Sequence, residues 1–69
     1  MIDQKMTYPP YYRRVFVKYQ RLDNKQYHID ILWLAVDDDN RRVWTFNNDY
    51  DTILDKDIKL INWWYINDI

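Results

Sequence analysis

Four residue types are missing from this chain: glycine, serine, glutamate and cysteine. The lack of cysteine excludes disulfides and thiolate zinc sites, and a single histidine excludes a histidine-based metal cluster. The lack of serine and cysteine removes the commonest nucleophiles of covalent catalysis. Every acidic residue is Asp, which favours turns, whereas Glu favours helices. We therefore expect a protein of strands and turns that is not an enzyme and has no cofactor and no metal.

Without glycine, another residue must adopt positive φ wherever a tight turn requires it. Asn and Asp tolerate the left-handed region better than other non-glycine residues. The candidates are Asn24, Asn40 and one of Asn47 or Asn48.

Length and charge set further limits. Sixty-nine residues make one domain, residues 1–69, in which we expect residues 1–7 to form a loose N-terminal arm. Ten Lys or Arg against eleven acids give a net charge of −1, so no overall field attracts nucleic acid or membrane. The longest uncharged apolar run, residues 31–36, is much shorter than the ~20 residues of a membrane span. We expect a cytoplasmic protein.

Residues 26–46 organise the chain as a β-hairpin. A strand over residues 27–36 ends in an apolar run, four turn-forming residues follow at 37–40, and residues 41–46 are again rich in β-branched and aromatic side chains. The second half of the first of these strands is apolar on both faces. That pattern is typical of a central strand covered on both sides, or covered by the core and by another chain.

Two further strands flank the hairpin. Residues 12–20 alternate, with Val15, Val17 and Tyr19 on one face. Asp51 can cap one helical turn over residues 52–56, and residues 58–66 then form either a last strand or an apolar helix. The aromatic cluster in that segment favours a strand. Strict alternation would set Ile58, Leu60, Trp64 and Ile66 against Ile61, Trp63 and Tyr65.

These elements predict an all-β or β-dominated fold. We expect a four-stranded antiparallel meander in the order 1-2-3-4, in which the sheet can roll partly into a barrel and one short helical turn precedes the last strand.

The segment Pro9-Pro10-Tyr11-Tyr12 matches the Pro-Pro-x-Tyr pattern that aromatic grooves bind. The structural alternative, which we favour, is that the prolines blunt a sheet edge and the tyrosines pack on it.

The order of features resembles a family of small phage and prophage domains of unknown function. The shared features are prolines near the start, Val15 and Val17 in the first strand, a central aromatic strand, a Trp after an acidic turn, and a closing strand with hydrophobic-x-x-Trp. The family's last strand usually reads His-Trp-Met-Pro-Leu-Pro, from which residues 62–65 depart, and the closing prolines are missing here. The resemblance implies a phage context and no particular activity.

Polar clusters offer few options for chemistry. His28 could be oriented by Asp30 on the same strand face for proton transfer, but a partly exposed histidine at a polar strand start is the simpler interpretation. Residues 37–40 crowd oxygen ligands as calcium sites do, but they lack the glycine and the bidentate Glu of an EF-hand loop. A solvated turn explains them better.

Basic residues interleaved with aromatic ones suggest a second possibility, a module that binds single-stranded nucleic acid. It requires the basic side chains to share one face with a ring that stacks on bases. The residues in question are Arg13, Arg14, Lys18, Arg41, Arg42 and Trp44.

The strongest signal is the aromatic content: four Trp, seven Tyr and two Phe. This is more bulk than one thin sheet can enclose, and Tyr and Trp dominate binding hot spots. We expect an exposed aromatic surface through which a phage or mobile-element protein binds and inhibits a host protein, such as a nuclease or defence enzyme. A homodimer that covers the same surface and a structural component of a virion are alternatives. The predicted surface consists of Tyr19, Tyr27, Trp33, Trp44, Trp63 and Tyr65.

Overall fold

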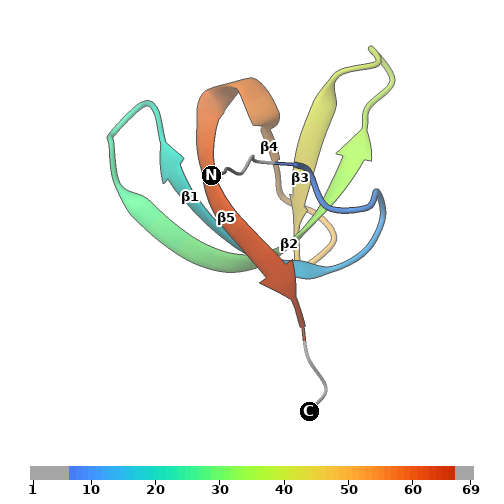
Figure 1. Cartoon of the computed structure of the whole chain (residues 1–69). Helices are drawn as coiled ribbons and strands as arrows, with labels where there is room; N and C mark the ends of the chain where they lie inside the picture. Colours follow the sequence, from blue (N-terminus) through green and yellow to red (C-terminus); the bar gives the residue numbers. More distant parts are fainter. Residues whose placement is uncertain (1–6, 67–69) are drawn as a thin grey trace.

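The computed structural model describes residues 7–66 and shows one antiparallel sheet. Its strands stand in the spatial order β4-β3-β2-β1-β5, and a single 3-10 turn is the only helical element of the described part (Figure 1). The all-β prediction is therefore confirmed. The elements are β1 (Val15–Arg21), β2 (Tyr27–Val36), β3 (Arg42–Phe46), β4 (Thr52–Leu54), the 3-10 turn η1 (Asp55–Asp57) and β5 (Ile58–Tyr65).

The strand number and order differ from the prediction. A short fifth strand, β4, occupies Thr52–Leu54, where we expected the start of a helical turn, and it forms because Ile53 packs against the core. The helical turn before the last strand is present one step later, as η1. The last strand pairs with β1 and not with β3, because the long strand β2 bends and rolls the sheet until β5 reaches β1 (Figure 1).

Asn and Asp build the turns that lack glycine. In the β2–β3 turn, the Asp37 carboxylate accepts the backbone N–H of Asp39 at 2.9 Å and that of Arg41 at 2.8 Å, and Asn40 has φ 64° as predicted. In the other two turns the prediction is wrong, because the positive φ lies at Lys25 and not at Asn24, and at Asp49 and not at Asn47 or Asn48.

The core fills the concave side of the bent sheet. The predicted inward face of β1, Val15, Val17 and Tyr19, is confirmed, since these side chains are at most 2 % exposed. Side chains from β2, β3 and β5 meet them there. The other members of the core cluster are Leu32, Leu34, Trp44 and Ile58.

Residues 7–12 lie across this core. The Tyr8 ring stacks on Trp44 at 6.3 Å between centroids, the Trp63 indole N–H donates to the Thr7 carbonyl at 2.8 Å, and the Tyr12 N–H donates to the Leu34 carbonyl at 2.8 Å. Pro9 is buried. The Pro-Pro-x-Tyr segment is thus part of the fold, as the structural alternative expects. Of the predicted N-terminal arm, residues 1–6 lie outside the described residues.

A β-bulge changes the faces of β5. Lys18 pairs with Asn62 and Tyr19 with Leu60, so Ile61 has no partner in β1. One extra residue in a strand reverses the alternation beyond it. Trp63 therefore faces the core side with Leu60, and Trp64 faces outward, which corrects the predicted grouping of Trp64 with Ile58 and Leu60.

Candidate protein-binding site

Apolar side chains gather on the convex side of the sheet. Phe16 of β1 is paired with Ile31 of β2 on one side and with Trp64 of β5 on the other. Directly opposed residues of an antiparallel ladder share a face, and the Phe16 and Trp64 rings stack at 6.1 Å. Ile29 and Trp33 continue this face along β2. We call these five residues the outer patch.

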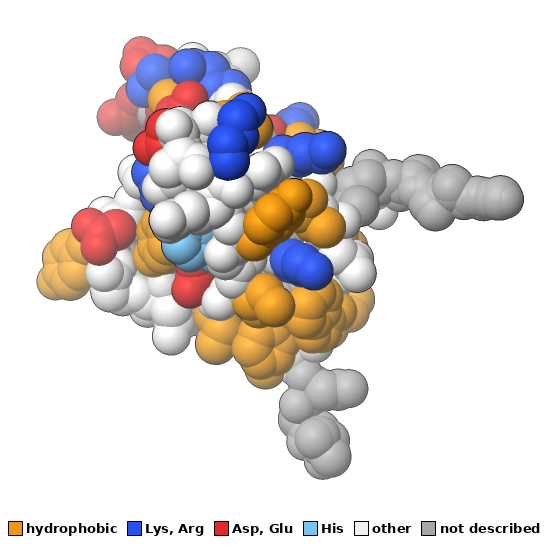
Figure 2. All heavy atoms as spheres, turned by 90° about the vertical axis from the view of Figure 1, so that its left-hand side faces the viewer, with side chains coloured by type: hydrophobic (Ala, Val, Ile, Leu, Met, Phe, Trp, Pro, Cys, Tyr) orange, Lys and Arg blue, Asp and Glu red, His pale blue; other side chains and the backbone are white. Residues whose placement is uncertain are grey.

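The outer patch is open to solvent over much of its area. Ile29 is 57 % exposed and Trp64 is 41 % exposed, whereas Phe16, Ile31 and Trp33 are half-buried. Figure 2 shows a gathering of hydrophobic side chains beside the C-terminal end of the described chain, with charged side chains concentrated at the opposite end. No second layer of the described chain covers Ile29 or Trp64. This is the arrangement expected of a central strand that meets the core on one face and another molecule on the other.

Hydrogen bonds hold one border of the outer patch in place. The Asp49 carboxylate accepts from the Arg14 guanidinium at 2.9 and 3.0 Å and from the Trp33 indole N–H at 3.1 Å. The Tyr12 ring lies 5.9 Å from the Trp33 ring. An indole fixed by both contacts loses little rotamer entropy when a partner covers it, which favours binding. Lys18 is exposed and is the ladder partner of Ile29, so a positive charge also borders the patch on β1.

Two of the six predicted partner-binding residues lie in the core and cannot form a surface. Tyr19 is 2 % exposed and its hydroxyl donates to Asp30 at 2.7 Å. Trp44 is fully buried and its indole N–H donates to Asp55 at 2.8 Å. Both lie on the concave face of the rolled sheet, where their apolar area is removed from water.

The other four predicted residues are near the surface but do not form one patch, although the Trp63 and Tyr65 rings contact each other edge to face at 5.1 Å. Trp33 belongs to the outer patch. Tyr27 is 63 % exposed at the start of β2, Trp63 is half-buried against the core, and Tyr65 lies beneath the Arg13 guanidinium at 4.3 Å. The prediction missed four members of the outer patch, although the register of the strands relates them. They are Phe16, Ile29, Ile31 and Trp64.

A second group of side chains surrounds the buried Trp44 ring, and we call it the inner cluster: Tyr8, Arg42, Trp44 and Asp55. The Asp55 carboxylate accepts from the Tyr8 hydroxyl at 2.7 Å and from Trp44. The Arg42 guanidinium lies over the Tyr8 ring at 4.1 Å and 3.7 Å from Asp55. Burial raises the pKa of Tyr8, and its hydrogen bond to Asp55 adds to that shift. The Asp55 carboxylate thus links Tyr8, Trp44 and Arg42, and this network ties the N-terminal segment to β3 and η1.

Three of the five basic residues predicted to bind nucleic acid are paired with acidic side chains in this structure. Arg14 is paired with Asp49, Arg42 belongs to the inner cluster, and Arg41 is paired with Asp37 at 2.9 Å. The stacking ring proposed for bases, Trp44, is buried. Of the six predicted residues, Arg13 and Lys18 have no acidic partner among the described residues, and Arg13 is held on a tyrosine ring.

The single histidine is not set up as a catalytic base. Asp30 accepts from Tyr19, and His28 stacks on the Tyr19 ring at 5.4 Å. The His28 Nε2 atom is buried and has no hydrogen-bond partner in the described part of the chain. Within residues 7–66 no three His or Asp side chains come close enough to hold a metal ion.

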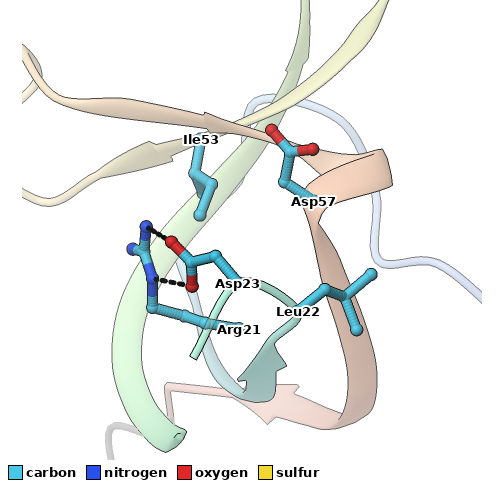
Figure 3. A pocket seen from close by; sticks show the side chains of 5 residues that line it. All are labelled: Arg21, Leu22, Asp23, Ile53 and Asp57. Carbon is cyan, nitrogen blue, oxygen red and sulfur yellow. Dashed lines mark hydrogen bonds and ion pairs between the residues drawn. The ribbon is translucent and has the colours of Figure 1, made fainter. Parts of the chain in front are cut away.

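An open hollow of about 410 Å³ lies between the β1–β2 turn, β4 and η1, as Figure 3 shows. Two of its charged lining residues, Arg21 and Asp23, pair with each other at 3.3 Å, and the third, Asp57, pairs with Lys56 at 3.4 Å. The hydrogen bond from Arg21 lowers the pKa of Asp23. Leu22, Ile53 and Asp57 complete the lining and converge on no single point, so the hollow offers no ligand a defined set of contacts.

No helix among the described residues has the length and apolar character needed to cross a membrane. Comparisons of the chain with family models, with curated proteins and with solved structures found no match. The resemblance to small phage domains therefore stays a prediction.

Proposed function

We propose that this chain is a non-enzymatic binding module that docks a protein partner on the outer patch. The observation that carries the proposal is that two large apolar side chains, Ile29 and Trp64, are open to solvent on a face whose remaining members are half-buried. Contiguous exposed apolar area of this kind marks interaction surfaces in small proteins. Trp is one of the side chains that supply most of the binding energy at such sites.

The narrower form of the proposal is inhibition of a host protein, such as a nuclease or a defence enzyme. Its support is the phage-like order of sequence features together with the lack of serine and cysteine nucleophiles. It predicts that the captured protein loses its own activity in proportion to the amount of chain added.

The proposal is tested by capture from host lysate with paired variants. Ile29→Lys places a charge in the outer patch, whereas Val36→Lys changes an exposed residue, 38 % open, at the far end of the same strand. A lysine buried in an apolar interface must be desolvated, so Ile29→Lys should weaken capture at least tenfold and Val36→Lys should leave it unchanged. A captured protein that is retained equally by both variants, or no stoichiometric protein at all, would count against the proposal.

A further inference from the structure

The two edges of the sheet are built differently. One edge is β4, a strand of three residues, and the other is β5, a strand of eight. Among the described residues β5 pairs with β1 alone, so one side of its backbone has no ladder. Proteins usually protect a long edge with prolines, charges or bulges. β5 has no proline and one charged residue, Lys59, and its bulge at Ile61 leaves the C-terminal half regular.

The hydrogen-bond pattern shows which backbone groups of β5 face this open side. At the end of β1, the Arg21 N–H donates to Gln26 on the β2 side and the Leu22 N–H donates to Asp57 on the β5 side. Alternate residues of a strand hydrogen-bond to opposite neighbours. The backbone groups of odd-numbered β1 residues therefore bond to β2, and those of even-numbered residues bond to β5. Phe16 is thus bonded to its opposite residue, Trp64.

It follows that Trp63 and Tyr65, the neighbours of Trp64, direct their N–H and C=O groups to the open edge. The Trp63 N–H accordingly donates to the side-chain oxygen of the preceding residue, Asn62, at 2.8 Å. A side chain thus occupies a donor that a neighbouring strand would use.

We propose that a second copy of the chain pairs with this edge, antiparallel, with Trp63 of each copy opposite Tyr65 of the other. This register is fixed by a two-fold axis at Trp64. It uses the outward backbone groups of both residues in both copies, and it makes Trp64 of the two copies a directly opposed, non-hydrogen-bonded pair. The side chains of such a pair approach most closely.

The chemistry of the edge supports a second copy as the occupant. An axis through Trp64 joins the two outer patches into one surface, because Trp64 is the patch residue on the edge strand. On the other face, Trp63 of one copy meets Tyr65 of the other, which repeats the edge-to-face contact that these rings make within one chain at 5.1 Å. A net charge of −1 leaves little repulsion between copies.

The size of the patch also favours this arrangement. An interface of ordinary size covers about 800 Å² on each partner, and one large exposed side chain supplies at most roughly 250 Å². With Ile29 and Trp64 about half exposed and the rest less so, one patch offers less than that area. Two patches joined at Trp64 approach the area of an ordinary interface, and Ile29 of both copies stays exposed to solvent. The dimer thus presents a doubled surface to the protein partner proposed above, although it does not depend on that partner.

Solution mass tests the proposal, measured by sedimentation equilibrium over a dilution series. The chain of 8.8 kDa should show twice that mass at the concentrated end. Trp64→Lys sets two like charges face to face, and Tyr65→Pro removes an edge N–H that β1 does not use, so each should weaken dimerisation at least tenfold. Leu22→Lys is the matched control, because Leu22 is also 41 % exposed but lies at the β1–β2 turn. A monomer throughout, or a dimer that either variant retains unchanged, overturns the proposal.

A cross-link tests the register independently of stability. Opposed residues of a non-hydrogen-bonded pair have Cα atoms roughly 4.5 Å apart, within the range that a disulfide spans. The chain has no cysteine, so Trp64→Cys introduces a single thiol, which should form a disulfide-linked dimer under mild oxidation much faster than Leu22→Cys. Equal rates for the two variants contradict the register.

The two proposals can fail separately. A chain that is monomeric but still captures its partner refutes the dimer alone. Equal capture by Ile29→Lys and Val36→Lys refutes the proposed function alone.

Discussion

Trp44 and Trp64 lie on opposite faces of one rolled sheet and have opposite surroundings. Trp44 is fully buried, stacked under Tyr8 and hydrogen-bonded to Asp55. Trp64 is 41 % exposed and stacks on Phe16 alone among the rings of the described chain. In the inner cluster Asp55 links the polar groups of Tyr8, Trp44 and Arg42, whereas the outer patch ends in open apolar surface. The first arrangement stabilises the chain, and the second is suited to binding.

The largest difference between the two residues is expected when each indole is truncated to alanine and the loss of folding stability is measured. Trp44→Ala should cost about 3–5 kcal/mol, through lost burial, the cavity left behind and the Asp55 carboxylate that loses a donor. In a chain of this size such a loss removes most of the folding stability. Trp64→Ala should cost about 1 kcal/mol or less, because its indole already contacts water. Urea titration followed by circular dichroism measures both, and equal midpoints for the two variants would contradict the distinction.

A smaller effect on stability is expected at Tyr19, whose buried hydroxyl donates to the Asp30 carboxylate. Burial raises the pKa of Tyr19 above its ordinary value of 10.0, and the hydrogen bond to Asp30 adds to the shift. The unfolded chain therefore loses this proton first as the pH rises. The stability that Tyr19 contributes is complete below about pH 10 and declines above it.

Tyr19→Phe should therefore destabilise the chain by about 1–2 kcal/mol at neutral pH, because Asp30 loses its buried donor. It should also flatten the decline in unfolding free energy above pH 10. Urea titrations at a series of pH values measure both effects. Wild-type and variant curves that run parallel from pH 7 to the alkaline limit would show that this hydroxyl does not couple to folding.

The smallest effect on stability is expected from removing the Tyr8 hydroxyl of the inner cluster. Tyr8→Phe keeps the ring over Trp44 and removes the hydroxyl that donates to Asp55. The expected cost is about 1 kcal/mol, since Tyr8 is partly exposed and water can replace the donor. Tyr50→Phe is the control, because Tyr50 is 86 % exposed and should show no change. If both variants unfold at the same urea concentration, the hydrogen bond from Tyr8 to Asp55 does not stabilise the fold, and the cluster stabilises it only through ring packing.

Much of this fold could be predicted because local patterns determine it. The alternation of Val15, Val17 and Tyr19 predicted the buried face of β1, and the extent of β2 follows from its β-branched and aromatic residues. The β2–β3 turn follows from Asp37 and Asn40, whose side chains and backbone suit a tight reversal without glycine.

The site was harder to predict because it depends on features that no local pattern contains. The bulge at Ile61 decides that Trp63 and Trp64 face as they do, and one unpaired residue is not visible in an apolar run. The bend of β2 decides which face becomes concave, and so places Trp44 inside while Phe16 and Ile31 remain outside. A sequence rich in rings predicts that some are exposed, but only the register shows which.

The most direct test of the account is footprinting of the four indoles by brief exposure to hydroxyl radicals, read by mass spectrometry at increasing protein concentration. Trp44 should be protected at every concentration. Trp64 should react readily in dilute solution and become protected over the range in which the solution mass doubles. Equal reactivity of Trp44 and Trp64 in dilute solution, or a Trp64 that stays reactive after the mass has doubled, would contradict the division between rings that fold the chain and rings that bind.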